Sequence, residues 1–319
     1  MNTLSSVGSS TISNRKIRVA VANNPSVKTT LNLEYSPSSQ TTIANSGRGD
    51  YVSFCASGGI YSSSNYGSTF SFNSLNFVFT SIAMSSSGQY QVCVSSGLPS
   101  CVIYMSDTYG VSWVLRRNLG ANANRFTEQA VISSTGQFIF VAGSGSQGLQ
   151  SFYSNNFGST FLDIGGAGGR FSCCISNDRA LYVSAGDSNI YSVLVSATTP
   201  TEPLFRTGAF GSSTHRVFSN STGSIIAVSH RTPTSFSISV DSGTTYSIIS
   251  TPQFIQFHII SGIFFGCSSS QLFRSNNNGA TWIVLYTLPA GKTIRSMSGN
   301  ITFINMVYNS GEIVVFTLS

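Results

Sequence analysis

Short runs in which apolar and polar residues alternate recur along the whole chain, and they predict β-strands. Gln137–Val141 (QFIFV) and Ser224–Val228 (SIIAV) are clear examples, each bounded by a cluster of small polar residues. Clusters of Ser, Thr, Asn and Gly separate one run from the next, as expected for tight turns. No segment shows the helical period of about 3.6 residues. The pattern therefore predicts an all-β protein.

An eight-residue turn recurs through the chain at a spacing of roughly forty residues. The last copy reads SNNNGATW, and copies begin at Ser63, Ser106, Ser154, Ser239 and Ser275. The gap between the copies at Ser154 and Ser239 is about double the others, so we expect a degenerate copy near Thr198–Pro200. A period of this length is typical of four-stranded propeller blades.

A second turn, in which a small polar residue leads into an apolar strand, precedes each copy by roughly twenty residues. Its forms are Ser87–Tyr90, Thr135–Phe138, Gly49–Tyr51, Arg179–Leu181, Gly223–Ile225, Gly262–Phe264 and Gly299–Ile301, spaced 37 to 48 residues apart. Seven such turns predict a seven-bladed β-propeller that occupies residues 1–319 as one domain, with residues 1–15 left over as a flexible N-terminal tail.

The two ends of the chain complement each other in this scheme. The seventh unit reaches Glu312–Phe316 without its own eight-residue turn and outer strand, whereas a spare strand, Lys16–Ala22 or Thr29–Glu34, precedes the first unit. An open edge in a ring of sheets invites aggregation. We therefore expect an N-terminal strand to close the ring as the outermost strand of the last blade.

The eight-residue turn resembles the Asp-box (BNR) repeat, Ser-x-Asp-x-Gly-x-Thr-Trp, of sialidases, sortilin-type receptors, some glucan hydrolases and certain photosystem assembly factors. Only Asp241 fills the acidic position, but Asn can accept the same hydrogen bonds from the turn. The resemblance implies structural turns at the blade periphery, away from any ligand. The structural positions are Asn65, Gly67, Thr108, Gly110, Trp113, Asn156, Gly158, Asp241, Gly243, Asn277, Gly279 and Trp282.

The unusual feature of the composition is its low charge. Asp, Glu, Lys and Arg make up 8% of the chain, against roughly 25% in an average soluble domain, and Ser, Thr, Asn and Gly take their place. Such surfaces suit proteins that pack into shells, fibres or adhesins. The net charge is +6 without any Lys/Arg run, so nucleic-acid binding is not expected.

The N-terminus has no signal-peptide pattern and no segment is apolar enough to span a bilayer, so we expect a protein made in the cytosol. The six cysteines lack paired spacing and are interpreted as free thiols, although Cys93 and Cys101 flank a loop and could face each other. Cys173 and Cys174 are expected to point into different layers. Arg48-Gly49-Asp50 is interpreted as part of a turn rather than as an adhesion motif.

No catalytic, cofactor or metal residues are predicted. A sialidase site needs an arginine triad, a Tyr–Glu pair and an aspartic acid, and the early Arg-Ile-Pro of that family is absent. The glutamates lie in no recognisable family context, and a two-carboxylate glycosidase stays open because only spatial separation decides that chemistry. Gly143–Gly148 fits GxGxxG but leads into a strand rather than a helix. The histidines lack ligand spacing. The glutamates are Glu34, Glu128, Glu202 and Glu312, and the histidines are His215, His230 and His258.

If both turn types lie on one face of the propeller, the opposite face carries the longer loops and the connections between blades. Much of the scarce positive charge falls there, either as scattered solvated residues or as a basic face for an anionic glycan or an acidic protein. The candidate residues of this ligand face are Arg116, Arg117, Arg125, Arg170, Arg231 and Lys292.

The sequence thus favours a non-enzymatic β-propeller that acts as a structural or interaction module. The low charge and the absence of an assembled active site suggest a component of a virus particle or another surface assembly, with other proteins as partners. A lectin-like propeller that binds glycans is the alternative, and an Asp-box glycoside hydrolase is the third hypothesis.

Overall fold

The computed structural model describes the chain with gaps, over residues 26–32, 42–95, 101–120, 125–145, 151–164, 170–176, 179–184, 190–194, 204–206, 214–230, 235–254, 256–300, 302–310 and 312–317. All regular elements in these ranges are β-strands, which confirms the all-β prediction. The expected tail 1–15, the candidate strand Lys16–Ala22 and the degenerate turn near Thr198–Pro200 lie outside the described residues.

The strands form four-stranded antiparallel sheets and one six-stranded sheet. In chain order the strands of the six-stranded sheet are β2 (Ile43–Asn45), β3 (Val52–Ser63), β4 (Ser71–Met84), β5 (Gln91–Ser95), β6 (Val102–Ser106) and β7 (Val114–Asn118). The next two sheets contain β8 (Arg125–Ile132), β9 (Ile139–Gly145), β10 (Ser151–Ser154) and β11 (Leu162–Ile164), and then β12 (Arg170–Ile175), β13 (Arg179–Ser184), β14 (Ile190–Leu194) and β15 (Leu204–Arg206).

The remaining strands continue the same order. One sheet contains β16 (Thr214–Ser219), β17 (Ile226–His230), β18 (Ser235–Ser239) and β19 (Ser247–Ser250), and the next contains β20 (Gln256–Ile260), β21 (Ile263–Cys267), β22 (Gln271–Ser275) and β23 (Ile283–Thr287). The last sheet combines β24 (Ile294–Gly299), β25 (Phe303–Tyr308) and β26 (Glu312–Thr317) with β1 (Ser26–Asn32).

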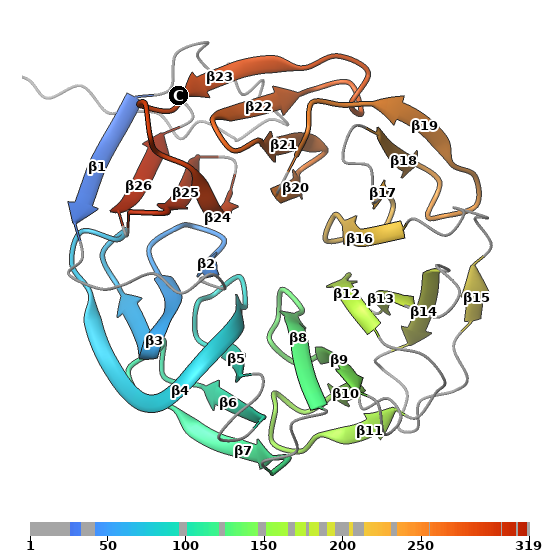
Figure 1. The fold of residues 1–319 in the computed structure, drawn as a ribbon. Helices are drawn as coiled ribbons and strands as arrows, with labels where there is room; N and C mark the ends of the chain where they lie inside the picture. Colours follow the sequence, from blue (N-terminus) through green and yellow to red (C-terminus); the bar gives the residue numbers. More distant parts are fainter. Residues whose placement is uncertain are drawn as a thin grey trace, which may run out of the picture.

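The sheets stand around a central axis like the blades of a propeller (Figure 1). The strand order of each four-stranded sheet runs from the axis to the rim. The innermost strands β8, β12, β16, β20 and β24 therefore surround the axis. Strand β4 serves two blades, because its first half pairs with β3 and its second half, from Phe79 to Met84, pairs with β5. The β-propeller prediction is therefore confirmed as an architecture.

Strand β1 pairs with β26 in antiparallel register, from Ser26 opposite Thr317 to Asn32 opposite Glu312. The sheet order β1-β26-β25-β24 places this N-terminal strand at the rim, as expected. It overlaps the second of the two candidate segments, Thr29–Glu34. Two segments from opposite ends of the chain thus share one blade, as Figure 1 shows in blue and red.

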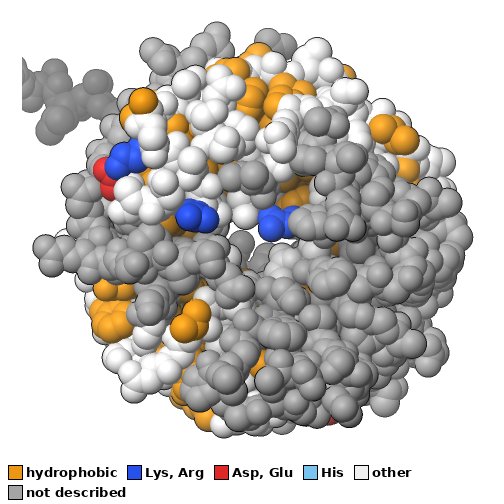
Figure 2. All heavy atoms as spheres, in the orientation of Figure 1, with side chains coloured by type: hydrophobic (Ala, Val, Ile, Leu, Met, Phe, Trp, Pro, Cys, Tyr) orange, Lys and Arg blue, Asp and Glu red, His pale blue; other side chains and the backbone are white. Residues whose placement is uncertain are grey.

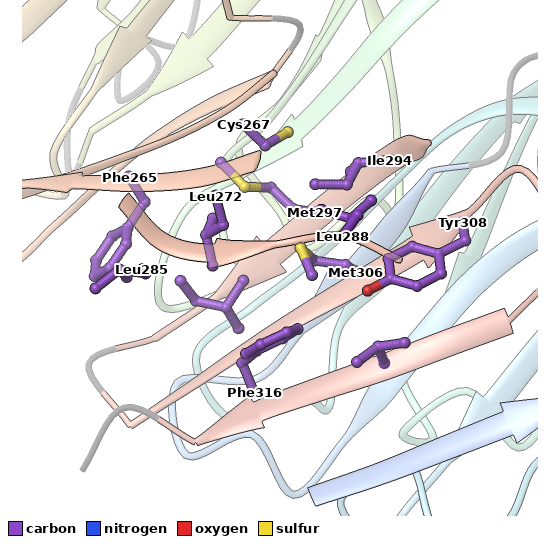
Figure 3. Packing of buried hydrophobic residues seen from close by; sticks show 12 residues of the cluster. Phe265, Cys267, Leu272, Leu285, Leu288, Ile294, Met297, Met306, Tyr308 and Phe316 are labelled. Atoms are coloured by element: carbon purple, nitrogen blue, oxygen red, sulfur yellow. The ribbon is translucent and has the colours of Figure 1, made fainter. Parts of the chain in front are cut away.

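The core lies between neighbouring sheets, and successive residues of a strand point into different layers. Phe265 and Leu272 pack against Met306 and Phe316 of the last sheet (Figure 3). Their neighbours Phe264 and Phe273 instead join a cluster with Phe236 and Phe257. Because both faces of each sheet are covered, the middle strands are buried along most of their length.

The adjacent cysteines follow this alternation. Cys173 packs with Phe140 and Tyr153 on one side of its sheet, whereas Cys174 lies against the cluster of Val217 and Val228 on the other, as predicted. No disulfide joins any of the six cysteines, Cys93 and Cys101 included. Burial raises the pKa of Cys55, Cys174 and Cys267 to about 12, so these thiols stay protonated and serve as small apolar residues.

Candidate functional site

Both kinds of turn lie on one face of the propeller, which we call the turn face. The backbone N–H of Tyr66 in the first eight-residue turn donates to the carbonyl oxygen of Asp50 in the preceding turn at 3.0 Å. The N–H of Phe157 donates to the carbonyl of Gln137 in the same way, at 3.1 Å. The shared location expected from the sequence is therefore confirmed.

Side-chain oxygens hold the eight-residue turn together. Ser63 Oγ accepts a hydrogen bond from the Gly67 N–H at 3.0 Å, and Asn65 Oδ1 accepts one from the Thr69 N–H at 2.9 Å. Asn65 Nδ2 donates to the Thr69 hydroxyl at 2.8 Å. The same bonds recur in the copies that begin at Ser154 and Ser275. These groups satisfy the turn's own backbone, and none of them is left over for chemistry.

The remaining copies show that the third position needs an acceptor rather than a charge. Thr108 Oγ1 accepts from the Ser112 N–H at 3.0 Å, although it is neutral. Asp241 accepts from the hydroxyl and N–H of Thr245 and from the hydroxyl of Ser239, which lowers the pKa of its carboxyl to about 2.

The aromatic at the end of the turn anchors the outer strand in the core. Trp282 packs against Phe254, with ring centroids 4.7 Å apart, and against Phe257. The Nε1 atoms of Trp113 and Trp282 have no hydrogen-bond partner in the described part of the chain, so these side chains act through apolar packing. Gly279 has φ +83°, and a Cβ there would lie 2.3 Å from Ile249 Cδ1, so this position requires glycine.

The innermost strands begin on the opposite face, which we call the connection face. Most of these strands carry a β-bulge near their start, where one residue has no partner across the ladder and the register shifts. Bulges at the rim of a channel re-aim a side chain. The bulged residues are Thr80, Glu128, Phe171, His215 and Arg295.

Polar side chains that follow the bulges join the innermost strands to one another. Ser81 Oγ accepts from the Ala130 N–H at 3.1 Å, and Gln129 Oε1 accepts from the Cys173 N–H at 3.1 Å. Ser172 Oγ accepts from the Val217 N–H at 3.3 Å. The ring continues across the junction between the last and first units, where Ser296 Oγ accepts from the Ile43 N–H at 3.2 Å. These bonds pair backbone groups at the inner edges of the sheets and link each sheet to the next.

Inner strands that carry an arginine at or near their start surround this mouth. Arg125 and Arg170 are the first residues of β8 and β12, while Arg216 and Arg295 lie near the starts of β16 and β24. Lys and Arg side chains flank the central opening in the space-filling view (Figure 2). Arg295 is exposed although both neighbours in its strand are buried. Burial lowers the pKa of Arg216, and nearby Cys267 opposes that shift.

The predicted ligand face is therefore divided. Arg116 is exposed on β7 at the rim, far along its blade from the axis. Arg117 ties two sheets together, because it binds Asp163 at 2.7 Å and the Phe161 carbonyl at 2.8 Å and lies over the Phe152 ring. Lys292 pairs with Glu312 at 2.5 Å. Arg231 lies outside the described residues.

Sequence reasoning missed Arg216 and Arg295. Both lie inside strands, β16 and β24, whereas the sequence pattern placed the ligand residues in loops and in the connections between blades. A comparison of where the inner strand of each unit begins would have shown the recurring arginine. Position within the blade, rather than loop length, is thus the signal that identifies the channel mouth.

The other candidate residues have structural contacts. Asp50 accepts hydrogen bonds from Ser46 and from its neighbour Tyr51, which supports the interpretation of Arg48-Gly49-Asp50 as a turn. His258 Nε2 lies 2.8 Å from the Met297 carbonyl oxygen, which can only accept, so Nε2 carries the proton. Burial lowers the pKa of His258 and keeps it neutral. Gly143–Gly145 are the last residues of β9, and the next described element is the strand β10, whereas a dinucleotide site needs a helix there.

Within the described ranges, no group of three or more His, Cys, Asp or Glu residues is placed to hold a metal ion. The side chains of Glu128 and His215 lie outside the description, as do Glu34 and Glu202. Lys292 and Ser310 hold the pKa of Glu312 below its usual value. The same ranges contain no helix that could cross a bilayer.

No family model matches the sequence, and no curated protein does so either. Solved structures do match by fold. One is YCF48 bound to D1 peptide, with 12% identity and a TM-score of 0.66 over 91% of this chain and 95% of that one. Another is YCF48 from Cyanidioschyzon merolae, with 11% identity and a TM-score of 0.65 over 92% and 99%. At these identities the likeness shows a shared β-propeller fold.

Proposed function

We propose that the chain is a seven-bladed β-propeller with Asp-box turns that acts as a non-enzymatic interaction module. The blade count rests on the six-stranded sheet, which holds two units that share β4. The Asp-box assignment rests on the recurring Ser-to-Gly and Asn-to-Thr bonds, in which Asn65, Asn156 and Asn277 replace the acidic residue.

The channel mouth on the connection face is the proposed binding surface, and the observation that carries this proposal is the set of inner strands around it that carry an arginine at or near their start. Arg125, Arg170, Arg216 and Arg295 belong to strands of four different sheets, and these strands surround one axis only because the ring closes. Positive charge beside a low-dielectric channel attracts anionic groups. A protein of the same fold has been solved with a peptide bound. The partner is therefore proposed to be an acidic protein segment.

The composition supports a place in a larger assembly, such as a virus particle or a surface structure. Only 8% of the residues are charged, so much of the surface is suited to close packing against other proteins. Among the acidic side chains that the structure describes, Asp163 and Glu312 are in ion pairs and Asp241 stabilises its turn.

Fluorescence anisotropy with a labelled Glu/Ser peptide and its Gln/Ser counterpart tests the binding surface. We expect the acidic peptide to bind, with an affinity that falls as salt rises from about 0.05 to 0.5 M. Arg295→Gln removes an exposed guanidinium, and the dissociation constant is expected to rise roughly tenfold. Arg116→Gln, on the rim, is the matched control and should bind normally. Equal binding of both peptides, or an unchanged Arg295→Gln variant, would refute the proposed surface.

A further inference from the structure

The fourth position of the eight-residue turn separates the copies into two groups. Copies on three consecutive units carry an aromatic there, namely Tyr66, Tyr109 and Phe157. The later copies carry Ser242 and Asn278 instead. Since the hydrogen bonds of the turn are the same in both groups, turn formation does not explain the aromatics.

The backbone at this position disfavours an aromatic residue. All five residues adopt the left-handed conformation, with φ values of 61°, 60°, 57°, 60° and 55° in chain order. Asn is enriched several-fold in this region, whereas a bulky side chain is strained. At Asn278, the same position of the last copy, the chain has the residue type that this backbone conformation favours. Three strained aromatics in succession therefore point to a role beyond the turn.

Each of these rings is paired with an aromatic of the preceding blade. Tyr109 stacks on Tyr51 with ring centroids 4.7 Å apart, and Phe157 packs on Tyr90 at the same distance. The ring centroids of Tyr66 and Phe303 are 5.8 Å apart, across the junction where the last blade meets the first. The three pairs thus occupy three successive junctions between blades.

The three side chains stay partly open to solvent despite this stacking. Tyr66 is 49% exposed, and Tyr109 and Phe157 are each 38% exposed. The turns of these blades are joined side by side, because the Gly47 N–H donates to the Ser86 carbonyl and the Ser86 N–H to the Ser134 carbonyl. The aromatics therefore form a fixed arc on the turn face.

The surroundings of the arc are polar but nearly uncharged. Exposed neighbours in the three turns include Ser64, Asn65, Ser68 and Ser159, with Asp107 as the exposed acid, and Arg48 is exposed in the adjoining turn that leads to Tyr51. Hydroxyl and amide groups beside flat exposed rings suit a ligand that has apolar C–H faces and many hydroxyl groups. The charges of Arg48 and Asp107 are opposite in sign, so a strongly charged ligand would find no net complementary charge here.

We propose that this aromatic arc, formed by Tyr66, Tyr109 and Phe157 with their partners Phe303, Tyr51 and Tyr90, binds a neutral oligosaccharide. The C–H faces of successive pyranose rings would pack on the exposed aromatic rings, and the surrounding amides and hydroxyls would bind the sugar hydroxyls. The pairing on the preceding blade holds each ring in place before binding, so little side-chain entropy is lost. The site is distinct from the basic channel mouth on the opposite face.

The test uses the chain's own alternative residue at this position. Tyr66→Asn, Tyr109→Asn and Phe157→Asn copy Asn278 and relieve the strained conformation, so the melting temperature should not fall. The probe is an array of neutral oligosaccharides of glucose, galactose, mannose and N-acetylglucosamine, beside sialylated and sulfated glycans and a set of aromatic-rich peptides. The best probe is then titrated by calorimetry, with Ser242→Asn as the matched control.

We expect binding to a neutral oligosaccharide that each aromatic-to-Asn variant weakens roughly two- to tenfold and that the triple variant weakens on the order of a hundredfold, while Ser242→Asn binds normally. The proposal is overturned if no neutral glycan binds, if only anionic glycans or peptides bind, or if the triple variant binds as well as the parent. A lower melting temperature with unchanged binding would show that the arc serves only to pack the blades together.

Discussion

The turn that begins at Ser275 allows the acceptor argument to be tested at a single atom. Asn277 Oδ1 accepts hydrogen bonds from the Ser275 hydroxyl at 2.8 Å and the Thr281 N–H at 3.0 Å, and Nδ2 donates to the Thr281 hydroxyl at 2.9 Å. Asn277→Ala removes all three bonds. Asn277→Asp keeps the two that use an acceptor, and its second oxygen can accept from the Thr281 hydroxyl, as Asp241 accepts from Thr245.

A hydrogen bond contributes roughly 0.5–1.5 kcal/mol net, and water replaces part of that at an exposed position. We therefore expect Asn277→Ala to lower the free energy of unfolding by about 1–2 kcal/mol and the melting temperature by roughly 2–4 °C. Asn277→Asp should stay within about 0.5 kcal/mol of the parent at neutral pH. Urea denaturation of both variants, with the exposed neighbour change Asn276→Ala as a control, gives the comparison. Equal losses in Asn277→Ala and Asn277→Asp would refute the view that this position needs only an acceptor.

Two further predictions concern acid stability and the inner ring. The folded-state pKa of Asp241, about 2, lies below its ordinary value of about 3.9, so its stabilising effect is complete above the higher value and lost as pH falls through the lower one. Urea titrations between about pH 2 and 5 should show a weaker pH dependence in Asp241→Asn than in the parent. Ser81→Ala leaves the buried Ala130 N–H without its acceptor, and we expect a loss of about 1–3 kcal/mol. Calorimetry of Ser81→Ala should show a clear drop in melting temperature, and that of exposed Ser64→Ala should not.

The local turns were predictable because their chemistry is contained in eight consecutive residues. Ser275, Asn277 and Gly279 bond to one another within the segment, so their spacing alone identifies the turn. The alternation of Cys173 and Cys174 between two layers was predictable for the same reason, since a strand with both faces covered sends neighbours in opposite directions.

The candidate site was predictable only in part. Arg125 and Arg170 were predicted to lie in connections, and they are the first residues of β8 and β12, with side chains outside the described part of the structure. Arg117 holds two blades together through Asp163 and Phe152. A sequence pattern does not distinguish a solvated arginine from one that pairs across a blade junction, because the partner lies 46 residues away. The same limit applies to Tyr109, whose stacking partner Tyr51 belongs to the preceding unit.

The sequence by itself determined the all-β class, the repeating unit and the turns that end each strand, since hydrogen bonds and apolar alternation at short range specify them. The tertiary structure alone decided which side chains meet. Strands β8 and β24 come from opposite halves of the chain and surround one axis only when β1 pairs with β26 and the ring is complete. The strained aromatics form one surface for the same reason, because each of them stacks on an aromatic residue that a different repeat supplies.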